Sequence, residues 1–185
     1  MFDYNNYGLI EYPNPILRQK AEPVTVFNDD VRKKAYLMHK IMAEKGGIGL
    51  AANQIGLLER IIIIDAKLID DHKRSYYTFV NPEILSSEGE YVNDSEGCLS
   101  HPGIRISVKR PKKIKLKYQD VDGNFHENNF ESVEGNIVAQ VIHHEIDHLL
   151  GVTIIDCMTP GQKMINDKKL IRLEKEYRKL KKSRQ

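Results

Sequence analysis

The chain has 185 residues, of which 41% are hydrophobic and 29% are charged, and its formal net charge is +2. This length and composition are typical of one soluble globular domain with a single core. We expect no membrane span, because the longest purely apolar run, residues 61–64, is far too short to cross a bilayer. Residues 1–10 have neither the basic start nor the apolar segment of a signal peptide, so we expect the chain in the cytoplasm.

The number of cysteines and the distribution of charge say more about the kinds of site that the chain can form. Cys98 and Cys157 are too few for a disulfide framework, so each is expected to be a free thiol or a metal ligand. Residues 163–185 carry ten Lys or Arg and three acidic residues, a net charge of +7, whereas the preceding 162 residues have a net charge of −5. The carboxyl-terminal tail is therefore a separate electrostatic element.

The first half of the chain predicts a helix followed by strands. Asn28 is placed to cap a helix that runs to about Lys45 and ends at Gly46 and Gly47, with an inner face formed by Val31, Ala35, Met38 and Met42. Strands are expected at residues 61–64, 75–80 and 104–108, and apolar residues alternate with lysines over 113–118 as in a half-exposed strand. Those lysines are interpreted as a solvated strand face, and Asp122-Gly123 predicts a hairpin turn.

The second half predicts a helix over residues 137–150, which Gly135-Asn136 introduces and Gly151 caps, then a short strand at 152–155 and a terminal helix. Because the strands come in a run and do not alternate with helices, the fold class is predicted as α+β, with mixed or antiparallel sheets around the central helix. Residues 1–162 are expected to form the main body of one domain. Residues 163–185 are expected to be a basic amphipathic helix of that same domain.

The most informative motif is HEIDH at residues 144–148, inside the apolar run from 137 to 150. On a helix, His144 and His148 lie about 40° apart around the axis and one turn apart along it, so both can bind one metal ion. Glu145 lies beside them, where it can take a proton from a water molecule that the metal activates. Buried charges are costly unless they are paired or bind a metal, so the pattern predicts a hydrolytic metal site.

A catalytic metal of this kind needs a third protein ligand from elsewhere in the chain. The metzincin pattern is excluded because Ile154 stands where its last histidine should be, and a downstream glutamate could only be Glu174 or Glu176 in the basic tail. Cys98 lies in a turn-rich context that can present a thiolate, whereas Cys157 is better interpreted as a small core residue. Spacing alone does not choose between the two cysteines, and His101 and His126 also stay open.

Residues 46–56, GGIGLAANQIG, are too rich in small side chains for an ordinary helix and lack the lysine of a phosphate-binding loop. Such a backbone can approach a ligand closely, and Gln54 offers an amide donor for a developing oxyanion. Taken alone, the segment is better explained as a plain connection between a helix and a strand.

Three segments together resemble, in order and spacing, the three signature motifs of peptide deformylases: residues 47–54 (GIGLAANQ), 96–100 (EGCLS) and 144–148 (HEIDH). The similarity also covers residues 12–18, residues 81–84 and the DGN turn at 122–124, so that it spans residues 8 to about 156. It implies a compact α+β fold and a hydrolase of N-terminal processing in protein biosynthesis. Such an enzyme removes the N-formyl group from the formyl-methionine of new polypeptides and releases formate.

The resemblance also implies roles for individual residues. It makes Cys98, His144 and His148 the metal ligands and Glu145 the general base and acid. Gln54 and the backbone N–H of Leu99 would be oxyanion donors, and Gly49 would hydrogen-bond the substrate backbone. The methionine pocket would be lined by Ile48, Val141 and Ile142. Asp147, on the other side of His144, is expected to be a supporting partner, with Arg105 as its candidate ion pair.

One thiolate and two imidazoles suit zinc or iron, and the resemblance favours Fe(II), with zinc or nickel as substitutes. Three positions depart from the family pattern: His143 replaces a common Gln, His101 replaces a small aliphatic residue, and Gly135-Asn136 replaces Gly-Leu. None is a ligand or the base, so activity is expected to be retained. The two extra histidines titrate near neutrality and can alter substrate preference and pH response.

The basic tail, residues 163–185, has two interpretations. The tail predicts a helix docked on the body or a contact with ribosomal RNA or protein, since its net charge attracts phosphates. A general metallopeptidase and a non-catalytic binding protein are the competing functional classes. A comparison of formate release from a formylated peptide with cleavage of an unblocked peptide separates a deformylase from a general metallopeptidase. A copper site with Met158 as axial ligand is disfavoured, because such sites lie on loops of a β-sandwich.

Overall fold

The computed structural model describes residues 7–69 and 75–183. Residues 1–6 of the segment assessed as a signal peptide and residues 184–185 of the basic tail lie outside the described residues. In the described part, no helix combines the length and the apolar character needed to cross a membrane.

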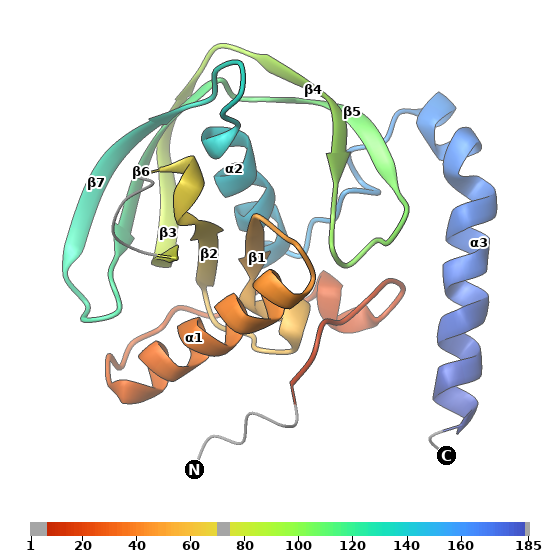
Figure 1. The fold of residues 1–185 in the computed structure, drawn as a ribbon, viewed down its shortest axis with the longest axis horizontal. Coiled ribbons are helices and arrows are strands. Elements are labelled where there is room, and N and C mark those ends of the chain that lie inside the picture. Colours follow the sequence, from red (N-terminus) through yellow and green to blue (C-terminus); the bar gives the residue numbers. More distant parts are fainter. Residues whose placement is uncertain (1–6, 70–74, 184–185) are drawn as a thin grey trace.

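The fold is α+β, as predicted, with two antiparallel sheets (Figure 1). The larger sheet has the strand order β1-β2-β3-β6-β7, with strands β1 (Gly49–Ala51), β2 (Ile61–Asp65), β3 (Tyr76–Glu88), β6 (Lys113–Gln119) and β7 (Phe125–Glu131). The smaller sheet pairs β4 (Tyr91–Gly97) with β5 (Arg105–Arg110). The helices are α1 (Asp29–Glu44), α2 (Val138–Leu149) and α3 (Pro160–Ser183), with short 3-10 turns η2 (Pro15–Arg18), η3 (Ala52–Ile55) and η4 (Ala66–Leu68).

Helix α1 forms where the sequence predicts it. The Asn28 side chain accepts a hydrogen bond from the Asp30 N–H at 2.9 Å, which satisfies one free donor of the first turn. Gly46 has a left-handed backbone with φ of 66°, which ends the helix. The predicted inner face is buried, and its Val31, Met38 and Met42 pack in one core cluster with residues of β1 and β2. Helix α1 therefore supports one side of strands β1 and β2.

The hairpin of β6 and β7 confirms the predicted alternation. Ile114 and Leu116 are buried, whereas Lys113 and Lys115, which alternate with them, are exposed. Lys115 forms an exposed ion pair with Glu127 across the hairpin at 2.9 Å, so the lysines form a solvated strand face. Gly123, at φ of 88°, lies in the predicted turn.

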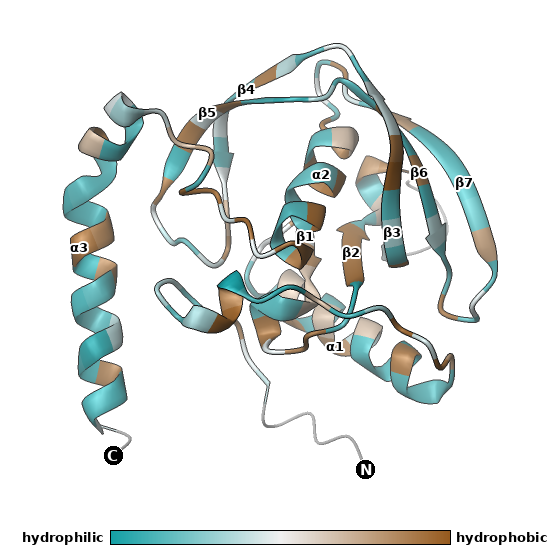
Figure 2. Cartoon of the chain, turned by 180° about the vertical axis from the view of Figure 1, so that it is seen from behind, coloured by the Kyte–Doolittle hydropathy of each residue, from teal (hydrophilic) through white to brown (hydrophobic). Residues whose placement is uncertain are grey.

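Helix α2 lies at the centre of the molecule, between the two sheets (Figure 1). It begins at Val138, one residue after the predicted start at Ile137, and the Asn136 side chain accepts a hydrogen bond from the Val138 N–H at 3.0 Å. Gly151, with φ of 76°, caps its other end as predicted. Figure 2 shows that the apolar residues are concentrated on α2 and the neighbouring strands of the larger sheet. The core therefore surrounds the helix that carries residues 144–148.

The predicted strand at residues 152–155 is wrong, because the chain forms turns there. The Asp156 carboxylate accepts hydrogen bonds from the Thr153 N–H at 2.8 Å and from its hydroxyl at 3.0 Å. These bonds fold the segment back on itself, so Ile154 is buried without pairing to a sheet.

The terminal helix is present as α3, at the side of the molecule (Figure 1). Leu173 is buried in a cluster with Ile106 and Ile154, and Tyr12 donates a hydrogen bond to Glu174 at 2.9 Å. Most of the remaining surface of α3 is polar (Figure 2). The helix is therefore docked on the body through a narrow apolar stripe.

Candidate metal centre

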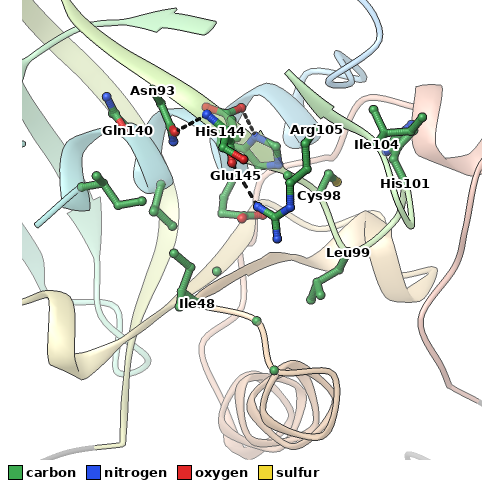
Figure 3. Close-up of a pocket in the computed structure, with 18 of the residues that line it drawn as sticks. Ile48, Asn93, Cys98, Leu99, His101, Ile104, Arg105, Gln140, His144 and Glu145 are labelled. Carbon is green, nitrogen blue, oxygen red and sulfur yellow. Dashed lines mark hydrogen bonds and ion pairs between the residues drawn. The ribbon is translucent and has the colours of Figure 1, made fainter. Parts of the chain in front are cut away.

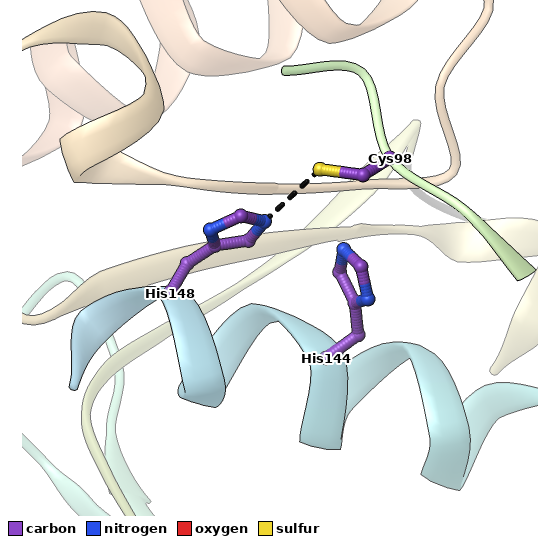
Figure 4. A group of neighbouring side chains, drawn as sticks. All are labelled: Cys98, His144 and His148. Carbon is purple, nitrogen blue, oxygen red and sulfur yellow. Dashed lines mark hydrogen bonds between the residues drawn. The ribbon is translucent and has the colours of Figure 1, made fainter. Parts of the chain in front are cut away.

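Three side chains from two distant segments meet beside α2 (Figure 4). Cys98, His144 and His148 each offer one ligand atom, and these atoms lie within 4.8 Å of one another. The Cys98 Sγ lies 3.2 Å from the His148 Nε2. A tetrahedral ion with metal–sulfur and metal–nitrogen bonds of about 2.3 and 2.1 Å would separate these atoms by about 3.6 Å. The three residues therefore fit one divalent metal ion.

Secondary structure explains why these side chains converge. His144 and His148 lie one turn apart on the same face of α2, as the sequence predicts. Cys98 comes directly after the end of β4. Strand β4 itself was not predicted, because its register shifts between Asn93 and Glu96 and interrupts the alternation of apolar residues. The turn-rich residues 93–95, which suggested a loop, lie at the register shift within strand β4.

A buried hydrogen-bond network holds His144 in position. Its Nδ1 donates to Glu96 at 2.7 Å, and Arg110 donates two hydrogen bonds of 2.7 Å to the same carboxylate. Burial opposes ionisation of Glu96, but its bonds from Arg110 and His144 outweigh this effect and lower its pKa to about 2. Glu96 is therefore a carboxylate that fixes both the tautomer and the orientation of a ligand histidine.

The predicted partner of Asp147 is wrong. Arg110, not Arg105, donates to Asp147 at 2.8 Å, while Arg105 donates to the Ser95 carbonyl at 3.0 Å. Side chains alternate along β5, and Arg110 lies on its buried face whereas Arg105 lies on its exposed face. His143 contacts the same Arg110, with 2.9 Å between the Arg110 Nη1 and the His143 Nδ1.

The protonation of the two histidines also fits a metal site. Burial lowers the pKa of His148 well below the ordinary value and so favours the neutral ring that binds metals. Burial also opposes protonation of His144, but Cys98 and Glu96 raise its pKa well above the ordinary value. A cation between Cys98 and His144 would replace that proton.

Glu145 is buried beside the ligand group, and its Oε2 has no hydrogen-bond partner among the described residues. Burial raises its pKa to about 7, which suits a group that accepts and returns a proton near neutral pH. Gly49 lies directly against it, since a Cβ there would come within 2.5 Å of the Glu145 Oε1 and 2.7 Å of the Val141 Cγ1. Only a glycine lets strand β1 approach α2 this closely.

Gln54 points its amide toward the cysteine. The Ala51 N–H donates to the Gln54 Oε1 at 2.8 Å, which fixes the orientation of the amide. The Gln54 Nε2 then lies 3.1 Å from the Ser100 Oγ and 3.7 Å from the Cys98 Sγ. A buried N–H donor is thereby held next to the ligand group, where it can stabilise negative charge.

A cavity of about 330 Å³ opens onto this group (Figure 3). Its lining includes the predicted site residues Ile48, Gly49, Gln54, Cys98, Leu99, Val141, His144 and Glu145. Ile142 is not among the lining residues, because the next position along the helix turns it into the core, where it is fully buried. Ile142 therefore does not face this cavity, and its predicted contact with the methionine side chain stays a prediction.

The other candidate ligands lie outside this group, which is the one cluster of potential ligands found in the described part of the chain. Cys157 packs against an apolar cluster, as predicted. His126 contacts Asp120 at 3.0 Å on the β6–β7 hairpin, and His101 stacks on the Tyr12 ring. Met158 is buried in the same apolar cluster as Leu173.

Sequence reasoning assigned no role to Glu96, Arg110 or Gln140. Glu96 could have been found because an acidic residue two positions before Cys98 interrupts an otherwise small and polar turn. Arg110 could have been found because it falls in phase with the buried residues of its strand. Gln140 could have been found because it shares the stripe of His144 and His148 at intervals of four residues.

Comparisons with known proteins agree with this geometry. The family model described as polypeptide deformylase matches residues 7–164. A peptide deformylase of Thermotoga sp. (strain RQ2) is 38% identical over 165 residues, which cover 89% of this chain and 94% of the relative. A peptide deformylase of Zymomonas mobilis is 38% identical over 170 residues, covering 90% and 94% of the two chains.

Solved structures give the same result. A peptide deformylase of Plasmodium falciparum superimposes with a TM-score of 0.83 at 34% identity, covering 92% of this chain and 96% of its own. That of Thermotoga maritima gives a TM-score of 0.75 at 37% identity, with coverages of 83% and 98%. The chain therefore belongs to the polypeptide deformylase family, the metallo-hydrolases that remove the N-formyl group from newly made polypeptides.

Proposed function

We propose that this chain deformylates formyl-methionyl peptides with Glu145 as general base and acid, beside a cation held by Cys98, His144 and His148. The observation that carries the proposal is the meeting of three ligand atoms within 4.8 Å next to a buried carboxylate oxygen that has no hydrogen-bond partner in residues 7–69 and 75–183. A divalent cation bound there supplies Lewis acidity and lowers the pKa of a water molecule.

The chain's own residues account for the proton transfers. Glu145 accepts a proton from the water that attacks the formyl carbon, and its raised pKa of about 7 lets it hold that proton. As the C–N bond breaks, Glu145 gives the proton to the leaving amine nitrogen. The products are formate and a peptide with a free amino terminus.

Negative charge on the formyl oxygen requires donors that are already in place. Gln54 supplies an amide N–H whose direction is fixed by the hydrogen bond from Ala51. We propose the Leu99 backbone N–H as the second donor, since Leu99 lines the same cavity. Gly49 is proposed to pair with the substrate backbone, and Ile48 and Val141 to contact the methionine side chain.

Formate release tests this proposal. Formyl-Met-Ala-Ser should release formate, whereas Met-Ala-Ser should not be cleaved. Hydrolysis of the unblocked peptide without formate release from the blocked one would indicate a general metallopeptidase instead.

We further propose Fe(II) as the cellular metal, because the family resemblance favours iron and a thiolate with two imidazoles is a ligand set that suits it. Iron bound to a thiolate is open to oxidation, so activity of the iron form should decay in air while a nickel-loaded sample is stable. Full activity after days in air, with iron confirmed as the metal, would contradict this assignment.

The basic helix supports a proposal about location. We propose that the body formed by residues 1–162 is catalytic and that residues 163–185, with their net charge of +7, contact the ribosome in the cytoplasm, where the substrate is made. Lys168, Lys175 and Lys179 are exposed on α3. Replacing all three with Glu should reduce co-sedimentation with ribosomes and leave formate release from a free peptide unchanged. Unchanged co-sedimentation would remove the proposal.

A further inference from the structure

Gln140 is buried in the wall of the cavity with no hydrogen-bond partner for its side chain. The residue is 1% exposed, and neither its Oε1 nor its Nε2 meets a partner among the described residues. Its backbone N–H is satisfied by the Ser132 Oγ at 3.2 Å. A buried amide that makes no hydrogen bond is costly, so the side chain is suited to a partner that arrives with a ligand.

The surroundings of Gln140 combine apolar and polar groups. Ile48, Ile137 and Val141 line the same cavity, and so do Asn93 and Ser95. Figure 3 shows Gln140 beside Asn93, at the end of the cavity away from Cys98 and His101. This end can therefore receive an aliphatic side chain whose far end carries a hydrogen-bonding group.

The distance from the reacting group fits a side chain of methionine length. Gln140 precedes His144 by four residues on α2, which is one turn or about 6 Å along the helix. A substrate whose formyl group lies at the metal centre has the Cα that carries its first side chain one bond beyond the reacting nitrogen. That side chain can reach the amide.

We propose that Gln140 determines specificity by donating a hydrogen bond to the first side chain of the substrate, so that peptides beginning with formyl-methionine sulfoxide are also substrates. The inference rests on the proposed function of the same site. A thioether sulfur is a weak acceptor, whereas the sulfoxide oxygen is a strong one that an apolar pocket would reject. The Gln140 Nε2 supplies the donor that the sulfoxide needs.

The test compares kcat/KM for formyl-Met(O)-Ala-Ser with kcat/KM for formyl-Met-Ala-Ser. Gln140→Met keeps the length of the side chain and removes its amide, so the sulfoxide-to-methionine ratio should fall about three- to tenfold. Gln162→Met makes the same chemical change at the start of α3, where the amide binds the Ser107 carbonyl outside the cavity, and should leave the ratio unchanged. An unchanged ratio in Gln140→Met overturns the proposal.

The wild-type protein provides a second measurement if Gln140→Met does not fold. Its kcat/KM for the sulfoxide peptide should lie within about tenfold of that for the methionine peptide, because the buried oxygen has a partner. Discrimination of more than about a hundredfold against the sulfoxide overturns the inference while leaving the proposed function intact. Release of formate from neither peptide refutes the proposed function, and the inference with it.

Discussion

Glu96 accepts a 2.7 Å hydrogen bond from the Nδ1 of His144 and thereby leaves the Nε2 of that ring for the metal. Because Arg110 holds the same carboxylate, replacing Glu96 breaks a buried network as well as a contact to a ligand. Glu96→Gln should weaken metal affinity about 10- to 100-fold and lower the free energy of unfolding by about 3 kcal/mol. Titration against a competing chelator and urea unfolding measure the two effects.

Glu90→Gln is the matched control for this variant. Glu90 forms its ion pair with Lys109 at the surface, where both side chains are more than half exposed, so both quantities should stay at their wild-type values. Equal metal affinities in Glu96→Gln and Glu90→Gln would show that Glu96 does not support the ligand.

Removing the carboxylate of Glu145 should abolish proton transfer and spare the metal. Glu145→Gln has nearly the same shape as the wild-type residue, and the three ligands are untouched. The kcat for formate release should fall about 10³-fold, within the range for loss of a general base, while the metal content stays near one ion per chain. A variant that keeps a tenth of the wild-type kcat would refute the assigned role.

The close approach of β1 to α2 makes Gly49 sensitive to a single methyl group. In Gly49→Ala the new Cβ would overlap the Glu145 Oε1 and the Val141 Cγ1, so the base must move. We expect kcat/KM to fall about 10- to 100-fold, because small displacements of catalytic groups have effects of this size. Gly161→Ala is the control, since a Cβ there meets no atom of the described residues within 4 Å and its kcat/KM should be unchanged.

His101 predicts a dependence of stability on pH. Burial lowers its pKa to about 4, and both ring nitrogens lack a hydrogen-bond partner in the described part of the chain. The folded state binds this proton less well than the unfolded chain. The contribution of neutral His101 to the free energy of unfolding is therefore fully present above about pH 6.5 and is lost as the pH falls toward 4. Compared with His101→Leu, the wild-type protein should lose about 3 kcal/mol more between pH 7 and pH 4.

Urea unfolding of both proteins at several pH values in this range checks the prediction. Groups that do not interact with His101 contribute equally in both proteins, so the difference between them reports on His101 and on its electrostatic interaction with His144 and His148. Parallel curves of stability against pH would show that this histidine does not titrate during acid unfolding.

The sequence predicted the helices and strands whose caps, turns and apolar patterns lie within the segment itself. Helix α1 has a cap, an apolar face and a terminal glycine, and the hairpin of β6 and β7 has both alternation and a turn, so each could be located from local residues alone. The ligand histidines could be paired because the spacing of a helix fixes their geometry.

Other features depend on contacts that no local pattern contains. Residues 152–155 are as apolar as a strand, but hydrogen bonds from Thr153 to Asp156 hold them in turns. The partner of Asp147 depends on which face of β5 each arginine occupies, and thus on the register between β4 and β5. The choice of Cys98 over Cys157 rested on family resemblance, because bringing a cysteine to α2 requires the whole fold.

The most direct test of the metal centre is the titration of metal-free protein with Fe(II) under anaerobic conditions while formate release from formyl-Met-Ala-Ser is measured. Activity should rise linearly and reach a plateau at one ion per chain, and Cys98→Ala should show no such rise. Full activity in the chelated protein, or an identical titration in Cys98→Ala, would contradict a catalytic ion held by Cys98, His144 and His148.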